Sequence, residues 1–326
     1  MRLGLLKFLG LIGVTVLVHI APYPSISQGQ EYPTQTVQII GCWPPGGFTT
    51  ILASMVSEEA KKYLSKPVIT VFKPGAAGTI GAYHVAKAPP DGYTLLMGTV
   101  GHIVVAPFIQ KLDYTPQDFE IMGQIALNPF TFCVREDAPW GNLKELVAYA
   151  KKNPGVVTCG NSGTYTAMHL TAMRFEQVAG IKLTHVPFKG GSDCMTNVAG
   201  GHASMGIRVL GEGEPLVEAG KVRVLSVFDS KRCKFYPNVP TTKEEGFAVE
   251  AGAWAVLMAP RGTPKRILTT WENIVRQITH DKTFIEKADK LKMNIEFKRA
   301  EDFKKYYQEK INEYVELINK MGLKPS

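Results

Sequence analysis

Short apolar runs alternate with glycine-rich turns and amphipathic stretches along this chain, and that alternation constrains the fold more than any other feature. Residues 37–40 and 68–72 are apolar runs that predict strands, and the turn over 41–50 leads into a predicted helix over 51–64. A third strand is expected over 93–97, after a Pro-Pro-Asp-Gly turn. Strands that alternate with helices are typical of a mainly parallel sheet covered by helices.

A second series of the same kind begins near residue 131. It predicts strands over 131–134, 156–159 and 222–228 and helices over 142–153 and 167–179. Beyond about residue 253 the chain is expected to return to helices. One apolar stripe predicts the core-facing side of a long terminal helix, and its residues are Phe303, Tyr307, Ile311, Tyr314 and Ile318.

The two series predict two α/β lobes with a ligand cleft between them. Residues 32–130 and 253–326 are expected to form the first lobe, and residues 131–252 the second. In open α/β sheets, ligands bind beyond the carboxyl ends of strands, where the N–H groups of helix N-termini are free. The turns over 41–50 and 160–166 are therefore expected to face the cleft and to bind an anion.

The first residues predict a secretory leader. Residues 1–7 carry two positive charges, an apolar run follows over 8–21, and small polar residues appear over 25–27. The apolar run is short for a transmembrane helix, and no later stretch reaches the ~18 apolar residues that a span needs. We therefore expect a signal peptide over residues 1–27 and a mature protein that is soluble and periplasmic.

Charge and composition exclude several function classes. The formal net charge is +8, a moderate excess that can steer anions toward a site. No dense block of Lys and Arg with interleaved aromatic residues occurs, so nucleic-acid binding is not expected. The seven histidines and five cysteines form no metal-binding motif, so neither a metal nor another cofactor is expected. The cysteines are expected to be buried thiols, with one disulfide as the alternative.

Two glycine-containing turns resemble parts of catalytic motifs without completing them. Gly75, Gly78 and Gly81 match neither dinucleotide nor phosphate-loop spacing, and tight turn geometry explains them better. The Gly-Asn-Ser-Gly turn at 160–163 is one residue short of a nucleophile elbow, and His169 follows on the same predicted helix. A serine esterase is thus an alternative. No catalytic residue is assigned, because a triad needs hydrogen-bond reach that this helix does not obviously give.

A set of short motifs follows in a fixed order from about residue 32 to the C-terminus. They are Tyr32-Pro33, Pro44-Pro45-Gly46-Gly47, Lys73-Pro74-Gly75-Ala76-Ala77-Gly78, Ala88-Pro89-Pro90-Asp91-Gly92-Tyr93-Thr94-Leu95-Leu96, Asp118-Phe119, His169-Leu170, His185-Val186-Pro187-Phe188-Lys189-Gly190, Pro237-Asn238-Val239-Pro240-Thr241 and Ala259-Pro260-Arg261-Gly262-Thr263-Pro264. In this order they resemble the substrate-binding component of tripartite tricarboxylate transporters, the Bug-type family of periplasmic receptors.

The resemblance implies a Venus-flytrap receptor rather than an enzyme. Its two α/β lobes would each hold a mainly parallel sheet flanked by helices, and a monomer is expected. The implied ligand is a small organic anion, and the implied partners are the membrane permease subunits of a tripartite transporter. A ligand-sensing receptor for a membrane sensor kinase is an alternative that the sequence does not separate from transport.

The resemblance also implies a carboxylate site in which backbone groups and waters of two turns hold the ligand. It carries over to Trp43, Pro45, Gly46, Gly47, Phe48 and Thr49 on the first turn. On the second turn it carries over to Ser162, Gly163, Thr164, Thr166 and His169. Further candidates at the same cleft are Thr50, Thr99, His102, Asn161, Tyr165 and Arg208. Aromatic side chains at 43, 48 and 165 are expected to flank a flat ring.

Two departures from the family pattern predict the charge of the ligand. Relatives commonly carry an acid where this chain has Thr50, and another where it has Arg208. Both changes make the cleft more positive, and Arg can meet a carboxylate with two parallel N–H bonds. We therefore expect a dicarboxylate or an aromatic dicarboxylate as ligand. The alternative is that Arg208 points to solvent or pairs with Glu212 or Glu214.

Overall fold

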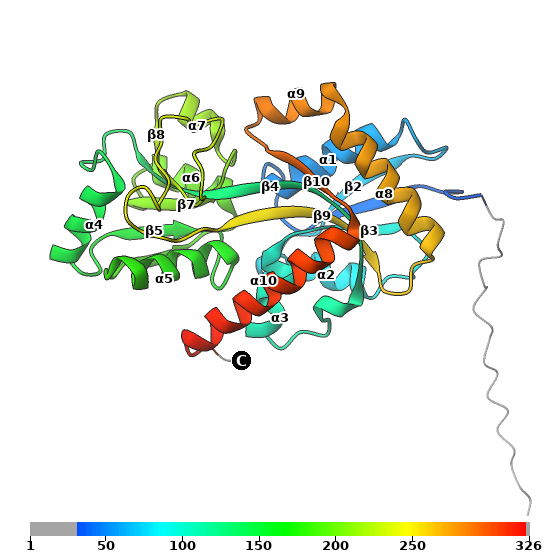
Figure 1. Cartoon of the computed structure of the whole chain (residues 1–326), viewed down its shortest axis with the longest axis horizontal. Helices are drawn as coiled ribbons and strands as arrows, with labels where there is room; N and C mark the ends of the chain where they lie inside the picture. Colours follow the sequence, from blue (N-terminus) through cyan, green and yellow to red (C-terminus); the bar gives the residue numbers. More distant parts are fainter. Residues whose placement is uncertain (1–30, 324–326) are drawn as a thin grey trace, which may run out of the picture. The chain divides into compact units, whose positions relative to one another are not determined.

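A β-sheet with helices on both sides forms the framework of the computed structural model, which describes residues 31–323 (Figure 1). The strands are β1 (Val37–Gly41), β2 (Val68–Phe72), β3 (Thr94–Gly98), β4 (Phe119–Arg135), β5 (Thr158–Asn161), β6 (Thr184–Pro187), β7 (Met205–Val209), β8 (Val222–Val227), β9 (Gly252–Pro260) and β10 (Ile295–Lys298). The helices are α1 (Phe48–Ala60), α2 (Thr79–Ala86), α3 (Ala106–Ile109), α4 (Leu143–Lys152), α5 (Ala167–Ala179), α6 (Gly191–Ala199), α7 (Glu214–Glu218), α8 (Lys265–His280), α9 (Lys282–Lys290) and α10 (Ala300–Lys320). The predicted leader over residues 1–27 lies outside the described residues.

Within residues 31–323 the strands form one sheet in the order β2-β1-β3-β9-β4-β7-β5-β6, and β8 and β10 also pair with β4. The pairs β1–β2, β1–β3, β5–β6 and β5–β7 are parallel. The pair β3–β9 and every pair that β4 makes are antiparallel. The sheet is therefore mixed, which corrects the expectation of a mainly parallel arrangement.

The long strand β4 connects the two parts of this sheet. It pairs with β9 over residues 119–129, and from Phe130 onward it pairs with β7 and β8. This change of partner coincides with the lobe boundary predicted between residues 130 and 131. The division into two lobes remains a prediction, because the described residues from Pro33 onward form one compact unit.

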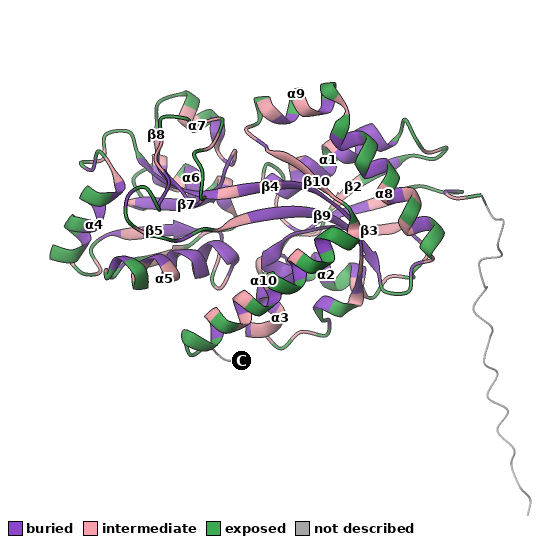
Figure 2. Cartoon of the chain, viewed as in Figure 1, coloured by how far each residue is buried: buried purple, intermediate pink, exposed green. Residues whose placement is uncertain are grey.

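Sequence analysis shortened or missed the strands that run through the middle of the sheet. The strand predicted over 131–134 is only the end of β4, and the expected return to helices beyond residue 253 is wrong for β9 and β10. Nearly all of β9 is buried, as Figure 2 shows. A strand buried on both faces is a continuous apolar run, and such a run does not by itself distinguish a strand from a buried helix.

The predicted helix boundaries agree best with the structure at the strand–turn–helix units. Helix α5 coincides with the helix predicted over 167–179, because the Thr166 side chain caps its start and Gly180 ends it in the left-handed conformation. Helix α1 begins at Phe48, before its predicted start, with Gly47 as the N-cap residue. The apolar stripe predicted for the terminal helix is the set of buried residues of α10.

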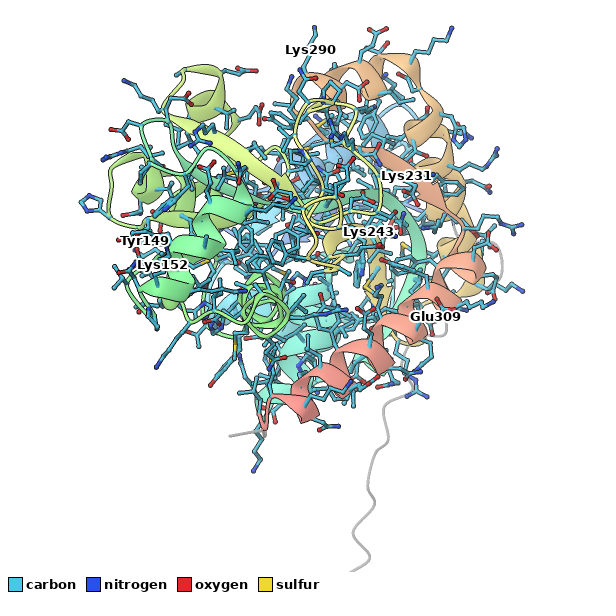
Figure 3. All side chains as sticks on the ribbon, turned by 60° about the vertical axis from the view of Figure 1, so that its left-hand side comes forward. Tyr149, Lys152, Lys231, Lys243, Lys290 and Glu309 are labelled. Atoms are coloured by element: carbon cyan, nitrogen blue, oxygen red, sulfur yellow. The ribbon has the colours of Figure 1, made fainter. Side chains whose placement is uncertain are left out.

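Most charged side chains lie on the outside of the molecule, and most thiols lie inside it. Tyr149 and Lys152 of α4, Lys290 of α9 and Glu309 of α10 are exposed (Figure 3). All five cysteines are free, and only Cys233 is not fully buried. The prediction of buried thiols is thus confirmed for the other four, which pack as small apolar residues.

Candidate ligand-binding cleft

A cleft of about 300 Å³ lies beside the carboxyl ends of several strands. Its lining comes from the segments that follow β1, β3, β5, β6 and β7, together with Phe130 of β4 and Ala253 of β9. This is the position at which open α/β sheets bind ligands. The predicted site residues that line the cleft are Trp43, Pro45, Gly47, Phe48, Thr49, Thr99, Ser162 and Thr166.

The first turn brings the N-terminus of α1 to the cleft. Gly47 and Phe48 line it, whereas Thr50 is buried in the turn itself. The Thr50 hydroxyl accepts a hydrogen bond from the Gly47 N–H at 3.1 Å and lies 3.1 Å from the carbonyl oxygen of Pro44. Thr50 therefore closes the turn rather than facing a ligand, and Gly46 also lies outside the lining.

The second turn brings the N-terminus of α5 to the same cleft. Ser162 donates a hydrogen bond to the Thr166 hydroxyl at 3.1 Å, and both residues line the cleft. Asn161 instead accepts a hydrogen bond from the Gly163 N–H at 2.9 Å, so its side chain stabilises the turn. Asn161, Gly163 and Thr164 do not line the cleft.

His169 and Tyr165 also belong to the internal structure of the second turn. Nδ1 of His169 accepts a hydrogen bond from the Tyr165 N–H at 2.9 Å, and neither residue lines the cleft. Burial, reinforced by the nearby His185, lowers the pKa of His169 to about 4. Because the Ser162 hydroxyl is directed at Thr166, His169 does not activate it as a nucleophile, and the geometry gives the esterase alternative no support.

His102 is buried beneath the cleft wall rather than in the lining. Its ring centroid lies 6.5 Å from that of Trp43, which does line the cleft. Nε2 of His102 accepts a hydrogen bond from the Thr99 N–H at 3.4 Å. Burial lowers the pKa of His102 to about 3, so the imidazole is neutral near pH 7. His102 thus supports Trp43 and Thr99 and is not placed to touch a ligand directly.

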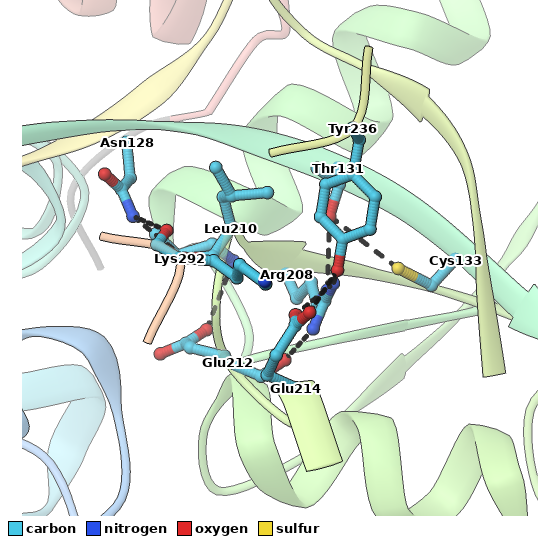
Figure 4. A network of polar contacts seen from close by, with 10 residues as sticks. Asn128, Thr131, Cys133, Arg208, Leu210, Glu212, Glu214, Tyr236 and Lys292 are labelled. Carbon is cyan, nitrogen blue, oxygen red and sulfur yellow. Dashed lines mark hydrogen bonds and ion pairs between the residues drawn. The ribbon is translucent and has the colours of Figure 1, made fainter. Parts of the chain in front are cut away.

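Arg208 does not line the cleft, which removes the geometric basis for its predicted contact with a ligand. Its guanidinium is completely buried and donates hydrogen bonds to the Thr131 hydroxyl at 3.3 Å and to the backbone carbonyl of Glu212 (Figure 4). It also reaches the Glu214 carboxylate at 3.3 Å and the Tyr236 hydroxyl at 3.4 Å. The pairing with Glu214, which the sequence left open as the alternative, is the one that the structure contains.

Glu212 is one of the cleft residues that sequence analysis missed, and it is the buried charged one. Its side chain lines the cleft and is only 7% exposed. One carboxylate oxygen accepts a hydrogen bond from the Phe48 N–H at 3.1 Å, and the other accepts from the Val209 N–H at 3.2 Å. A signal was present in the sequence, because Glu212 stands between two glycines, Gly211 and Gly213, whose positive φ angles turn the chain back toward the cleft.

Exposed polar groups complete the edge of the cleft. The Ser192 hydroxyl donates to the carbonyl of Gly46 at 2.8 Å, so this contact connects the segment after β6 with the turn after β1. Lys189 and Asp193 line the cleft from the same segment, and both are exposed. Within the described lining, Glu212 is therefore the one charged side chain that is buried.

Comparisons with known proteins place this architecture in a family. The family model described as "Tripartite tricarboxylate transporter family receptor" matches residues 52–323. The structure resembles Rpa4515 of R. palustris with adipate, at 27% identity and a TM-score of 0.86, covering 91% of this chain and 100% of that one. It resembles periplasmic binding protein BugD at 29% identity and a TM-score of 0.84, covering 90% and 100%. MatC from Rhodopseudomonas palustris with bound malate is 25% identical, with a TM-score of 0.82 and coverage of 88% and 100%.

The fold and the cleft define a periplasmic-binding-protein-like solute receptor, which confirms the α/β fold class predicted from the sequence. The chain belongs to the tripartite tricarboxylate transporter receptor family, as its Bug-type motifs indicated. Members of this family bind solutes and are receptors, not enzymes. Among residues 31–323, no helix is both long enough and apolar enough to cross a bilayer.

Proposed function

We propose that this chain is an exported receptor that captures a small organic carboxylate and delivers it to the permease subunits of a tripartite tricarboxylate transporter. Family membership supports the receptor role, and the similarity to a periplasmic binding protein supports action outside the cytoplasm. Closure of the protein around its ligand would present a distinct surface to the permease. A ligand produces such a population shift only through contacts that the open state lacks.

The observation that carries the proposal is that two helix N-termini open into one cleft. Gly47, Phe48 and Thr49 bring the start of α1 to it, and Thr166 and Ala167 bring the start of α5. Free N–H groups and the positive end of the helix dipole both favour an anion at such a position. A cleft of about 300 Å³ suits a small organic acid rather than a peptide or a nucleotide.

A dicarboxylate is the first ligand class to test. Arg208 does not support this ligand class, because it lies outside the cleft lining. The support comes instead from two similar proteins, one bound to adipate and one bound to malate, both of which are dicarboxylates. Trp43 and Phe48 line the cleft and suit the faces of a flat ring, so an aromatic dicarboxylate belongs in the same test.

A thermal-shift screen of the mature chain tests the ligand class. The panel contains adipate, malate, phthalate and hexanoate, with dimethyl adipate as the neutral control. A ligand that binds only the folded state raises the melting temperature, so at least one carboxylate should do so while the diester does not. Calorimetry then gives the dissociation constant. If no carboxylate binds, the proposed ligand class is wrong.

Reconstitution tests the delivery step separately. Permease subunits of a tripartite transporter, placed in vesicles, should accumulate the radiolabelled ligand only when the loaded receptor is added outside. Receptor with a filled cleft, such as Gly47→Val, is the control. Uptake that does not depend on the receptor would separate binding from transport and contradict the proposed partner.

A further inference from the structure

The turn after β7 places one of the protein's own carboxylates where a ligand carboxylate is expected. We propose that Glu212 occupies the anion position at the N-terminus of α1 and must take up a proton when an anionic ligand binds. Glu212 would then determine which ligand charges the cleft accepts. The inference rests on the proposed function, since it concerns the same cleft, but it makes claims about the ligand-free protein that can be tested separately.

The contacts of Glu212 resemble those of a bound carboxylate. Its two oxygens accept hydrogen bonds from the N–H groups of Phe48, the first residue of α1, and Val209, the last residue of β7. A Cβ atom at Gly191 would lie 1.7 Å from one of these oxygens, so only glycine leaves room for the carboxylate there. One side of the cleft is thus connected to the other by an internal acid that uses an amide of the α1 N-terminus.

Within residues 31–323, no Lys or Arg side chain forms an ion pair with this carboxylate. The Arg208 guanidinium is directed to Thr131, Glu214 and Tyr236, and it meets Glu212 only at the backbone carbonyl. Arg208 and Cys194 interact electrostatically with Glu212, and Lys189 and Asp193 share the cleft lining with it. Glu214 and Tyr236 contact Arg208 and act on Glu212 only through it. Burial raises the pKa of the Glu212 carboxyl above its ordinary value, and this effect outweighs the two N–H bonds and Arg208, which lower it.

A ligand carboxylate that approaches the α1 N-terminus therefore meets a like charge. Two carboxylates that share one site cannot both stay ionised at low cost, so the pKa of one of them rises further. Glu212 is the group that takes up a proton from solvent, because burial has already raised its pKa. Its protonated carboxyl donates an O–H bond instead of only accepting, which suits a ligand oxygen and releases the Phe48 N–H for the ligand.

The histidines near the cleft do not interfere with this titration. Burial lowers the pKa of His102 to about 3 and that of His169 to about 4, so both are neutral above pH 5. A dianionic ligand meets more repulsion from an ionised Glu212 than a monoanion does. The proton requirement should therefore be stronger for adipate than for hexanoate, which has the same chain length and one carboxylate fewer.

Calorimetry with adipate and hexanoate between pH 5.5 and pH 8 tests the proposal. For the wild-type protein, adipate affinity should fall by up to about tenfold per pH unit as pH rises, since one proton is taken up on binding. Buffers of different ionisation enthalpy should report that uptake directly. Glu212→Gln should bind adipate more tightly than wild type at pH 8 and with little pH dependence. Glu245→Gln, which removes a buried acid outside the cleft lining, should behave as wild type.

Adipate affinity that is independent of pH in the wild type, or equally pH-dependent in Glu212→Gln, would overturn the proposal. The wild-type measurement needs no variant, so the proposal stays testable even if Glu212→Gln folds poorly. If neither protein binds any carboxylate of the panel, the proposed ligand class fails, and melting of the proteins without ligand still tests Glu212. Because the pKa of Glu212 is raised in the folded state, its ionisation lowers the stability of the wild type as pH rises. The melting temperature of Glu212→Gln should therefore rise relative to that of the wild type between pH 5 and pH 8. A difference in melting temperature that stays constant over this pH range would contradict the proposal that Glu212 is a buried acid that ionises.

Discussion

The Arg208 guanidinium donates a hydrogen bond to the backbone carbonyl of Glu212, four residues further along the chain (Figure 4). The same guanidinium pairs with Glu214, so it holds both sides of the turn that directs Glu212 into the cleft. Arg208 therefore positions this turn, and we expect any effect of Arg208 on a ligand to pass through Glu212.

Arg208→Ala should lower the free energy of unfolding by about 3–5 kcal/mol, because it leaves the Glu214 carboxylate buried without its partner. The turn would also lose its bond to the Glu212 carbonyl, so Glu212 should leave the anion position more easily and adipate should not be weakened relative to hexanoate. Denaturant titration measures the first effect and calorimetry the second. Selective loss of adipate binding would instead indicate a direct contact with the second carboxylate.

Arg232→Ala is the matched control for this experiment. Arg232 also pairs with a glutamate, Glu244, at 3.0 Å, but both side chains are nearly half exposed. Exposed ion pairs contribute only ~0–1 kcal/mol. Arg232→Ala should therefore leave both stability and ligand binding almost unchanged.

Strand geometry explains why Arg208, which the sequence suggested as a cleft residue, does not line the cleft. Neighbouring residues of a strand point to opposite faces, so the side chains of Arg208 and Val209 cannot both face the cleft. Val209 lines it, and Arg208 is buried on the other side. The register that decides between them depends on pairing with β4, which lies more than seventy residues earlier in the chain. Local patterns do not contain that information.

The parts of the fold that could be predicted are those whose signals are local. Capping by Thr166 and termination at Gly180 gave the limits of α5, and the Gly-rich turns located both sides of the cleft. The antiparallel course of β9 depends instead on β3 and β4, its partners far along the chain. Its continuous apolar sequence is compatible with either a strand or a buried helix.

The leader prediction concerns residues outside the described structure and needs its own test. Mass spectrometry of protein purified from the periplasm should find an N-terminus near Gln28, because the apolar run and the small residues after it match a cleaved signal peptide. Replacing Leu11 and Val14 by Lys should block export and leave the full-length chain in the cytoplasm. Recovery of periplasmic protein that still begins at Met1 would contradict the prediction.

Gly47→Val should abolish carboxylate binding while the fold is retained. The backbone at Gly47 has φ −81°, which any residue adopts, so the glycine is needed for space and not for conformation. A Cβ there would stand 3.4 Å from the Glu212 carboxylate, an ordinary contact, whereas the two further methyl groups of valine would project into the lining. Gly47→Ala should therefore bind within a few-fold of wild type. Equal affinities of the alanine and valine variants in calorimetry would mean that the ligand does not approach this turn.

His102 should make the protein sensitive to acid. Burial lowers its pKa from 6.5 to about 3, so its neutral form contributes stability above pH 6.5 that is lost as pH falls toward 3. At pH 5 the loss should be about 2 kcal/mol relative to pH 7, from the 1.36 kcal/mol that each pKa unit represents. His102→Gln should remove this component, so denaturant titrations of the variant should change less between pH 7 and pH 5 than those of wild type. His280→Gln, at an exposed position, should keep the wild-type slope. If His102→Gln and wild type lose stability in parallel, the acid sensitivity arises elsewhere, and the other buried imidazole, His169, is the next residue to replace.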